Sequence, residues 1–138
     1  MAKPPRTATT GTFFITAITY KRRRLFQLPT NAELFIETLQ HYRHKGLFKL
    51  HAFVVMPDHI HLLLTTDDLS RSVRHIKGGF SHRLASHLPV WQRSFTDHRI
   101  RDNADFETHR HYIHQNPIRV HLAATADLYL FSSALIRP

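Results

Sequence analysis

Two histidines flank a single aliphatic residue in the segment Met56–Leu64, which reads MPDHIHLLL. In a β-strand, residues i and i+2 share one face and lie about 6.6–6.8 Å apart along the backbone. His59 and His61 can therefore converge on one metal ion with bonds of about 2.0–2.2 Å, while Ile60 points to the opposite face and into a core. Two polar histidines on an exposed sheet face are the competing interpretation, because the chain contains 13 histidines.

A second pair of residues, Tyr112 and Asn116, is spaced i, i+4 just before Pro117. This spacing places both on one face of a helix, while Phe106 and Ile113, seven residues apart, mark the face that packs on a sheet. The pair offers a phenol as a candidate nucleophile and an amide as a candidate third metal ligand. The alternatives are a half-buried packing aromatic for Tyr112 and a helix terminator for Asn116.

The absence of cysteine restricts the kinds of metal site that the chain can build. Any metal must be bound by histidine, carboxylate or amide groups, since no thiolate is available. Three further histidines share the helix of the tyrosine, but their spacings of two, three and five residues do not predict a zinc site on one face. They are His109, His111 and His114.

The elements that must position these residues follow the order β-α-β-β-α-β-α. The expected strands are 13–20, 48–57, 59–65 and 95–101, and the expected helices begin at Thr30 or Asn31, at Ser70 and at Asn103 and end near 45, 84 and 116, with a possible kink at Gly78-Gly79. This order predicts a ferredoxin-like (RRM-like) α+β sandwich, an antiparallel sheet with helices on one face plus a C-terminal helix that carries the tyrosine. Residues 1–10 are expected to form a flexible basic arm, and 11–138 a single domain with an irregular C-terminal tail.

The formal net charge of +9 predicts a polyanionic partner, and nucleic acid is favoured over an anionic membrane surface because no basic amphipathic helix with a large apolar face is evident. The longest apolar run, Ala52 to Met56, is much shorter than the roughly 18 residues of a membrane span, and the N-terminus lacks an apolar signal segment. We therefore expect no membrane association. The candidate DNA-binding residues are Arg22, Arg23, Arg24, Arg74, Lys77, Arg83, Arg93 and Arg119.

Several motifs in order resemble one known family. They are FFITAITYKRRRLF, MPDHIHLLL, the Lys77-Gly78-Gly79 segment, VWQRSFTDHRIRD at 90–102, HYIHQNPIRV at 111–120 and the Ser132-Ser133 pair. Together, from about Phe13 to Ser133, they resemble the REP-associated tyrosine transposases, relatives of the single-tyrosine HUH transposases of the IS200-like type.

The resemblance implies a cytoplasmic bacterial enzyme that nicks and rejoins single-stranded DNA at hairpin-forming REP-like repeats through a 5′-phosphotyrosine intermediate. It assigns His59 and His61 to a metal-binding pair, Tyr112 to the nucleophile and Asn116 to the amide ligand. A divalent ion, magnesium or manganese, is the implied cofactor, with zinc a tight-binding competitor. The chain departs from the usual Asn-Pro-Val-Arg-Ala-Gly sequence between Ile118 and His121, which affects the DNA contacts of that loop more than the chemistry.

Two other functions compete with a transposase. A non-catalytic module for single-stranded nucleic acid would use the basic face and aromatic residues such as Phe13 and Tyr20 for base stacking. A domesticated homologue would keep the nicking chemistry in a regulatory or toxin-like role. No nucleotide cofactor is expected, because the chain has no GxxxxGK[ST] loop. Either a monomer or a homodimer is compatible with the sequence.

Overall fold

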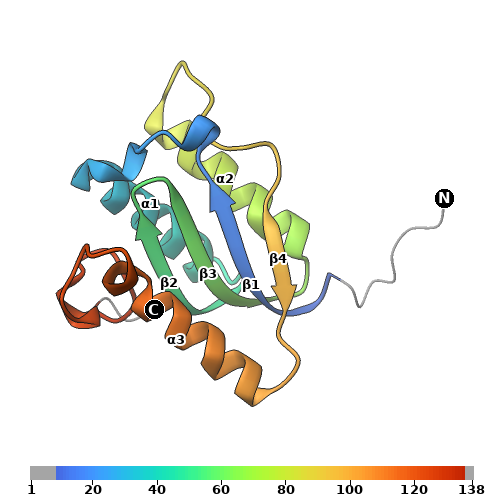
Figure 1. Cartoon of the computed structure of the whole chain (residues 1–138). Coiled ribbons are helices and arrows are strands. Elements are labelled where there is room, and N and C mark those ends of the chain that lie inside the picture. The colour runs from blue at the N-terminus through green and yellow to red at the C-terminus, as the bar shows by residue number, and fades with distance from the viewer. Residues whose placement is uncertain (1–8, 136–138) are drawn as a thin grey trace.

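A computed structural model describes residues 9–135; most of the expected N-terminal arm, residues 1–8, lies outside this range. The strands are β1 (Gly11–Ile18), β2 (Lys49–Met56), β3 (His59–Thr66) and β4 (Thr96–Arg99), and the helices are α1 (Pro29–His44), α2 (Leu69–Leu84) and α3 (Asn103–Arg119). Short 3-10 turns lie at Tyr20–Arg22, Leu25–Gln27 and Ala126–Leu128. The antiparallel sheet has the order β2-β3-β1-β4 (Figure 1), which confirms the ferredoxin-like prediction.

Strand β3 lies inside the sheet, paired with β2 on one side and β1 on the other. Its period of two sends Ile60, Leu62 and Leu64 to one face, where all three are buried in the main core. His59 and His61 alternate with them and therefore face the other side. The strand thus supplies core and candidate site from the same eight residues.

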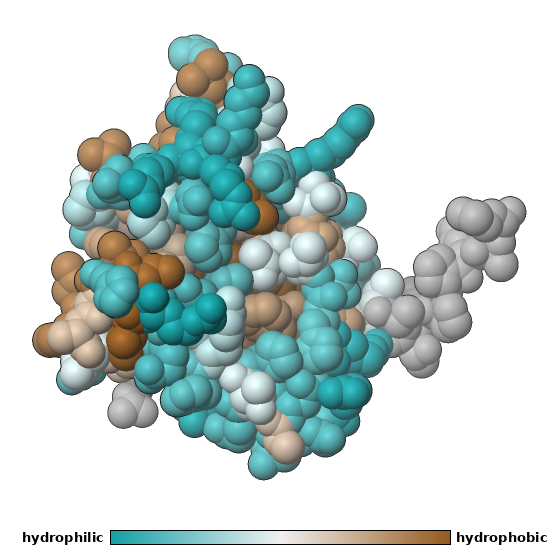
Figure 2. Space-filling model, viewed as in Figure 1, coloured by the Kyte–Doolittle hydropathy of each residue, from teal (hydrophilic) through white to brown (hydrophobic). Residues whose placement is uncertain are grey.

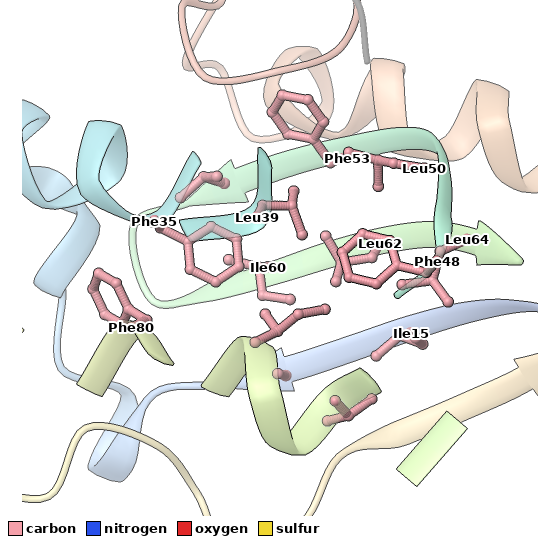
Figure 3. Packing of buried hydrophobic residues seen from close by; sticks show 14 of the residues in the cluster. Ile15, Phe35, Leu39, Phe48, Leu50, Phe53, Ile60, Leu62, Leu64 and Phe80 are labelled. Atoms are coloured by element: carbon pink, nitrogen blue, oxygen red, sulfur yellow. The ribbon is translucent and has the colours of Figure 1, made fainter. Parts of the chain in front are cut away.

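The main core fills the space between this first face and helices α1 and α2 (Figure 3). Phe35 and Leu39 of α1 and Phe80 of α2 are completely buried against the strand side chains. Burying each large apolar side chain contributes about 1.5–3 kcal/mol. This layer anchors β3 from behind, so the opposite face of the strand can hold polar residues in fixed positions.

Gly79 allows α1 and α2 to pack closely. A Cβ atom at this position would lie 2.6 Å from the hydroxyl oxygen of Tyr42 on α1, closer than real contacts allow. Helix α2 runs without interruption from Leu69 to Leu84 through Gly78-Gly79, where the sequence allowed a kink. The second glycine of the pair instead makes room for the neighbouring helix.

Helix α3 lies against the other face of the sheet, and the C-terminal segment lies beside β2 (Figure 1). Ile113 of α3 is fully buried in a second cluster with Val54 and Leu63. The tail is attached to β2: Tyr129 Oη donates a hydrogen bond to the Val55 carbonyl at 2.6 Å, and Ser132 forms an isolated antiparallel β-bridge with Val54. Strand β2 is therefore covered by the tail at its outer edge.

The N-cap of each helix lies one or more residues before the helix start that the sequence predicted. The N-cap of α1 is Leu28, with a proline in the first turn, and the Asn31 side chain donates instead to the Leu25 carbonyl at 2.8 Å. Aspartates cap the other two helices: Asp68 caps α2, and Asp102, rather than Asn103, caps α3. A carboxylate accepts the free backbone N–H groups and also favours the positive end of the helix dipole.

Helix α3 does not end at Asn116 but continues through Pro117 to Arg119. A proline removes one backbone donor, yet in the last turn of a helix few later hydrogen bonds depend on the geometry that it disturbs. Pro117 is itself buried, and its carbonyl accepts from Leu122 N–H at 2.8 Å. The extension brings Arg119 onto the same helix as Tyr112.

Figure 2 shows a largely hydrophilic face with hydrophobic residues gathered over the C-terminal segment. The exposed apolar side chains of that segment include Leu122, Leu128, Leu130 and Leu135. Among the helices of residues 9–135, none has the length and apolar character needed to cross a bilayer.

Candidate active site

The two histidines of β3 lie beside each other on the face of the sheet that α3 partly covers. Their ring centroids are 4.8 Å apart, and the ring planes are inclined by 74°. His59 Nδ1 lies 2.7 Å from Asp58 Oδ1, and His61 Nδ1 lies 2.8 Å from Thr16 Oγ1 on β1. Because a protein partner engages Nδ1 in each ring, Nε2 is the nitrogen left for an ion, the arrangement common to metal-binding histidines.

Burial and charge keep His61 neutral. The side chain is only 6% exposed, and this burial, with the nearby charges of His59 and Arg119, lowers the pKa of His61 to about 3. Around neutral pH the imidazole is uncharged and carries a free lone pair, as a metal ligand must.

Asp58 connects His59 to a basic residue. Partial burial acts to raise the pKa of Asp58, but the hydrogen bonds from His59 and Arg22 outweigh it and hold this pKa below its ordinary value. The Arg22 guanidinium lies 3.2 Å from Asp58 Oδ2. Lys21 and Arg22 both have a φ of 53°, a left-handed conformation that side chains disfavour, so the turn after β1 is strained where it meets Asp58.

Tyr112 projects from α3 and lies against His61. Its ring centroid lies 5.5 Å from that of His61 and 5.8 Å from that of Phe14, edge-on in both cases. The Arg119 guanidinium carbon lies 5.0 Å from the same ring centroid. The residue is 37% exposed, so the phenol packs against His61 and Phe14 and is also open to solvent.

Asn116 lies one helical turn after Tyr112 and is 5% exposed. Its Nδ2 atom is the one buried side-chain nitrogen or oxygen among residues 9–135 that has no hydrogen-bond partner. Leaving a buried N–H donor unpaired costs about 1–3 kcal/mol, so this NH2 group is expected to meet a water or a substrate oxygen; a cation would bind the other amide atom, Oδ1. The alternative role as a helix terminator is wrong, because α3 continues past this residue.

His59, His61 and Asn116 carry atom types that a divalent metal accepts as ligands. Two imidazoles oriented by their Nδ1 partners offer nitrogen ligands, Asn116 would offer its Oδ1 oxygen, and three protein ligands leave positions for phosphate or water. Manganese accepts imidazole readily, and magnesium prefers oxygen ligands.

A second group able to hold a divalent metal is made by His98 on β4 with Asp105 and His109 on α3. One ligand atom from each lies within 4.8 Å of the others. The spacings of the histidines within the tyrosine helix do not reveal this group, because His98 comes from a strand and the third member is a carboxylate. The signal that could have found it is the Asp-x-x-x-His spacing at 105–109, which places two donors on one helix face.

The basic residues after β1 have different environments. Arg22 is paired with Asp58 next to His59, and Arg23 donates from Nη1 to the Pro89 carbonyl at 3.1 Å. Arg24 is exposed. Only Arg22 is thereby brought directly to the histidine pair.

The basic residues of α2 border two grooves. Arg74 and Gly78 line both, one of about 340 Å³ with Arg83 and one of about 430 Å³ with Lys77 and Arg93. A Cβ at Gly78 would meet nothing within 4 Å, so the backbone is open to an approaching ligand. The Lys77 ammonium is partly used, because it donates to the Gln92 carbonyl at 2.9 Å. These residues form a surface separate from the histidine pair.

Comparisons with known proteins give relatives of one kind. The family model described as "Transposase IS200 like" matches residues 9–116. The REP-associated tyrosine transposase of Escherichia coli is 32% identical over 113 residues, which cover 79% of this chain and 67% of that protein.

Solved structures agree in fold. The structure of a REP-associated tyrosine transposase bound to a REP hairpin superposes with a TM-score of 0.81 at 28% identity, covering 96% of this chain and 82% of that one. A candidate transposase from Deinococcus radiodurans, at 19% identity and a TM-score of 0.58, covers 89% of this chain and 99% of its own and shares the fold. With the family match spanning most of the sequence, the chain belongs to the IS200-like transposase family and is an enzyme of the tyrosine transposase type.

Proposed function

We propose that this transposase nicks and rejoins single-stranded DNA at hairpin-forming REP-like repeats, with Tyr112 as the nucleophile. The observation that carries the proposal is the position of the exposed phenol of Tyr112, which lies against His61 and beside Arg119. A relative bound to a REP hairpin, similar over 96% of this chain, supports the substrate class.

The chemistry conserves the phosphodiester bond energy. The Tyr112 oxygen attacks the phosphorus and loses its proton, the O3′–P bond breaks, and the leaving 3′ oxygen takes up a proton. The product is a 5′-phosphotyrosine and a free 3′-hydroxyl. In the reverse step a 3′-hydroxyl attacks the phosphotyrosine and releases the phenol, so no nucleotide cofactor is needed.

His59, His61 and Asn116 would hold the divalent ion, magnesium or manganese. When bound, the ion supplies positive charge that stabilises the phosphate as negative charge develops on it. The chain prepares this site in advance: Asp58 and Thr16 fix the two imidazoles through Nδ1. Preorganised ligands need no rearrangement when the substrate enters.

Arg119 would act on the same phosphate as Tyr112. Its guanidinium lies 5.0 Å from the phenol ring centroid, and its charge also reaches His61, whose pKa it helps to lower. A guanidinium in this position can donate two hydrogen bonds to phosphate oxygens and align the scissile bond with the phenol.

The DNA strand would extend from this site onto basic surfaces. Arg22 and exposed Arg24 lie on the turn after β1, and Arg74, Arg83 and Arg93 border the grooves along α2. Phosphate contacts by such residues make binding strongly salt-dependent. We further propose that the enzyme acts in the cytoplasm, as a monomer or a homodimer.

The non-catalytic binding module is less well supported by the fold. Phe13, proposed for base stacking, is 1% exposed and lies in the main core, so only Tyr20 of that pair reaches solvent. Such a module also gives no reason for two neighbouring histidines that are both oriented through Nδ1.

The experiment that tests the proposal is cleavage of a single-stranded DNA carrying a hairpin, in magnesium or manganese. The wild-type chain is expected to nick the strand, and EDTA or the replacement His59→Ala should abolish nicking. The exposed variant His111→Ala, on the tyrosine helix, is the matched control and should nick at the wild-type rate. Full nicking in EDTA and by His59→Ala would overturn the metal-dependent mechanism.

A further inference from the structure

We propose that His98, Asp105 and His109 form a second metal site, separate from the His59-His61 pair and specific for a transition-metal ion of the zinc class. The site joins the end of β4 to the first turns of α3. It does not depend on the proposed nicking reaction.

The ligand atoms already lie close together. His98 Nε2 lies 2.9 Å from Asp105 Oδ2, and His109 Nδ1 lies 3.1 Å from Asp105 Oδ1. The three ligand atoms lie within 4.8 Å of one another. Ligands bound to one zinc ion at about 2.0–2.2 Å lie about 3.3–3.5 Å apart, so small side-chain rotations would suffice to admit an ion.

The donors suit zinc or cobalt better than magnesium. Two imidazoles and one carboxylate are a ligand set that binds zinc with a position left for water. Both imidazoles stay neutral when an ion binds: the proton sits on Nδ1 of His98 and on Nε2 of His109. His109 Nδ1 then gives up its present contact with the Asp105 carbonyl at 2.8 Å.

The surrounding structure holds the carboxylate in place and leaves a path to solvent. The Arg101 N–H donates to Asp105 Oδ2 at 3.0 Å, which fixes the carboxylate, whose side chain is 8% exposed. The Arg101 guanidinium, 3.6 Å from the same oxygen, is on a side chain that is 76% exposed and can turn away. His98 is 40% exposed, so an ion and a water can reach the group from outside.

The site would brace the helix that carries Tyr112. The rings of His98 and His109 stack with centroids 4.6 Å apart, and His109 lies 4.9 Å from Phe14. Phe14 in turn contacts both Tyr112 and His61. An ion that ties β4 to α3 therefore fixes a helix turn next to the phenol, a structural role that differs from holding substrate.

The test uses the full, tag-free chain and the metals alone. In the double variant His59→Ala/His61→Ala, titration with Co²⁺ or Zn²⁺ is expected to show one tightly bound equivalent, and Co²⁺ should give visible d–d absorption. Adding either His98→Gln or His109→Gln to the double variant should lower the affinity for this metal ion at least 10-fold. Glutamine at 98 can still donate to Asp105, so the metal-free fold is expected to persist, as circular dichroism in EDTA will check.

The control is His111→Gln, an exposed histidine two residues from His109 on the same helix, which should bind as the double variant does. A zinc-induced rise in melting temperature should accompany binding and disappear with His98→Gln or His109→Gln. If one of these variants is unfolded in EDTA, the other decides. The proposal would be overturned by any of three results. The double variant binds no metal ion tightly, the bound ion is retained with both glutamine changes, or His111→Gln weakens metal binding as much as they do.

Discussion

His59 Nδ1 lies 2.7 Å from Oδ1 of Asp58, the residue that precedes it in the chain. The carboxylate completes a sequence of contacts from Arg22 through Asp58 to His59, so a charge on the turn after β1 is linked to a ring on β3. A carboxylate behind a histidine fixes the ring orientation and makes the outer nitrogen a better ligand. Asp58 is therefore a positioning residue in the proposed site.

Replacing Asp58 by asparagine is expected to lower the nicking rate about 10–100-fold at limiting metal, because the uncharged amide orients His59 less well. Raising the manganese concentration should restore much of the activity, whereas a purely structural defect would not respond to metal. Asp67→Asn, which removes an equal charge from an exposed position, is the control. Full activity of Asp58→Asn at limiting metal would remove the residue from the proposed site.

Acid should destabilise the fold through His61. The pKa of this residue is about 3 in the folded chain and about 6.5 when unfolded, so the unfolded state binds the proton first. Its stabilising effect is complete above pH 6.5 and is lost as the pH falls toward 3. Between pH 6 and 4 the residue should lower the free energy of unfolding by about 1.4 kcal/mol per pH unit. The free energy of unfolding, measured with urea at each pH, should therefore change less steeply with pH in His61→Asn than in the wild type, by about this amount. Equal pH dependence in the two proteins would contradict a buried, neutral His61.

Side chains alternate between the two faces of β3, so residues that stabilise the fold differ from those proposed to bind the metal. Ile60 is 1% exposed in the main core, so Ile60→Ala should cost about 2–5 kcal/mol of unfolding free energy. Leu128→Ala, at a residue 63% exposed, should change stability by less than about 0.5 kcal/mol. Chemical denaturation measures both, and a decrease below about 1 kcal/mol for Ile60→Ala would be inconsistent with the strand register.

Salt dependence can locate the DNA path. The double variant Arg74→Ala/Arg93→Ala should reduce the slope of log affinity against log salt by about 0.7 for each phosphate of the single strand that these arginines neutralise. Arg43→Ala/Arg110→Ala removes the same charge elsewhere, and Arg110 is already paired with Glu107 at 2.7 Å. Binding of hairpin DNA between low and moderate salt gives the slopes. Equal slopes for the two double variants would place the strand away from the groove that Arg74 and Arg93 line.

The sheet and its helices could be predicted from the sequence because the spacing of apolar residues changes clearly between strand-like and helix-like patterns along the chain. The Pro57-Asp58 turn between two apolar runs predicts the β2–β3 hairpin as it is found. Helix ends were less predictable, since Asn103 and Asp102 are both good caps, and only the backbone geometry selects Asp102. The path of α3 through Pro117 depends on tertiary packing, which local propensity does not contain.

The candidate site was predicted as two separate pairs. Nothing in the spacing of His61 and Tyr112, 51 residues apart, says that their rings meet; that proximity depends on how α3 packs across the sheet. The sequence gives no sign that Asp58 contacts His59, because this contact depends on the side-chain rotamers of both residues. The group of His98, Asp105 and His109 was missed because it joins a strand to a helix.

The central claim is that Tyr112 forms a covalent bond with DNA. The most direct measurement is a denaturing gel of the protein incubated with labelled single-stranded hairpin DNA and manganese, for the wild type and for Tyr112→Phe. The variant removes only a hydroxyl from a residue that is 37% exposed, so folding and DNA binding should persist. We expect a covalent protein–DNA band from the wild type and none from Tyr112→Phe, with Tyr20→Phe, equally exposed, retaining it. A band of undiminished intensity from Tyr112→Phe would contradict the claim.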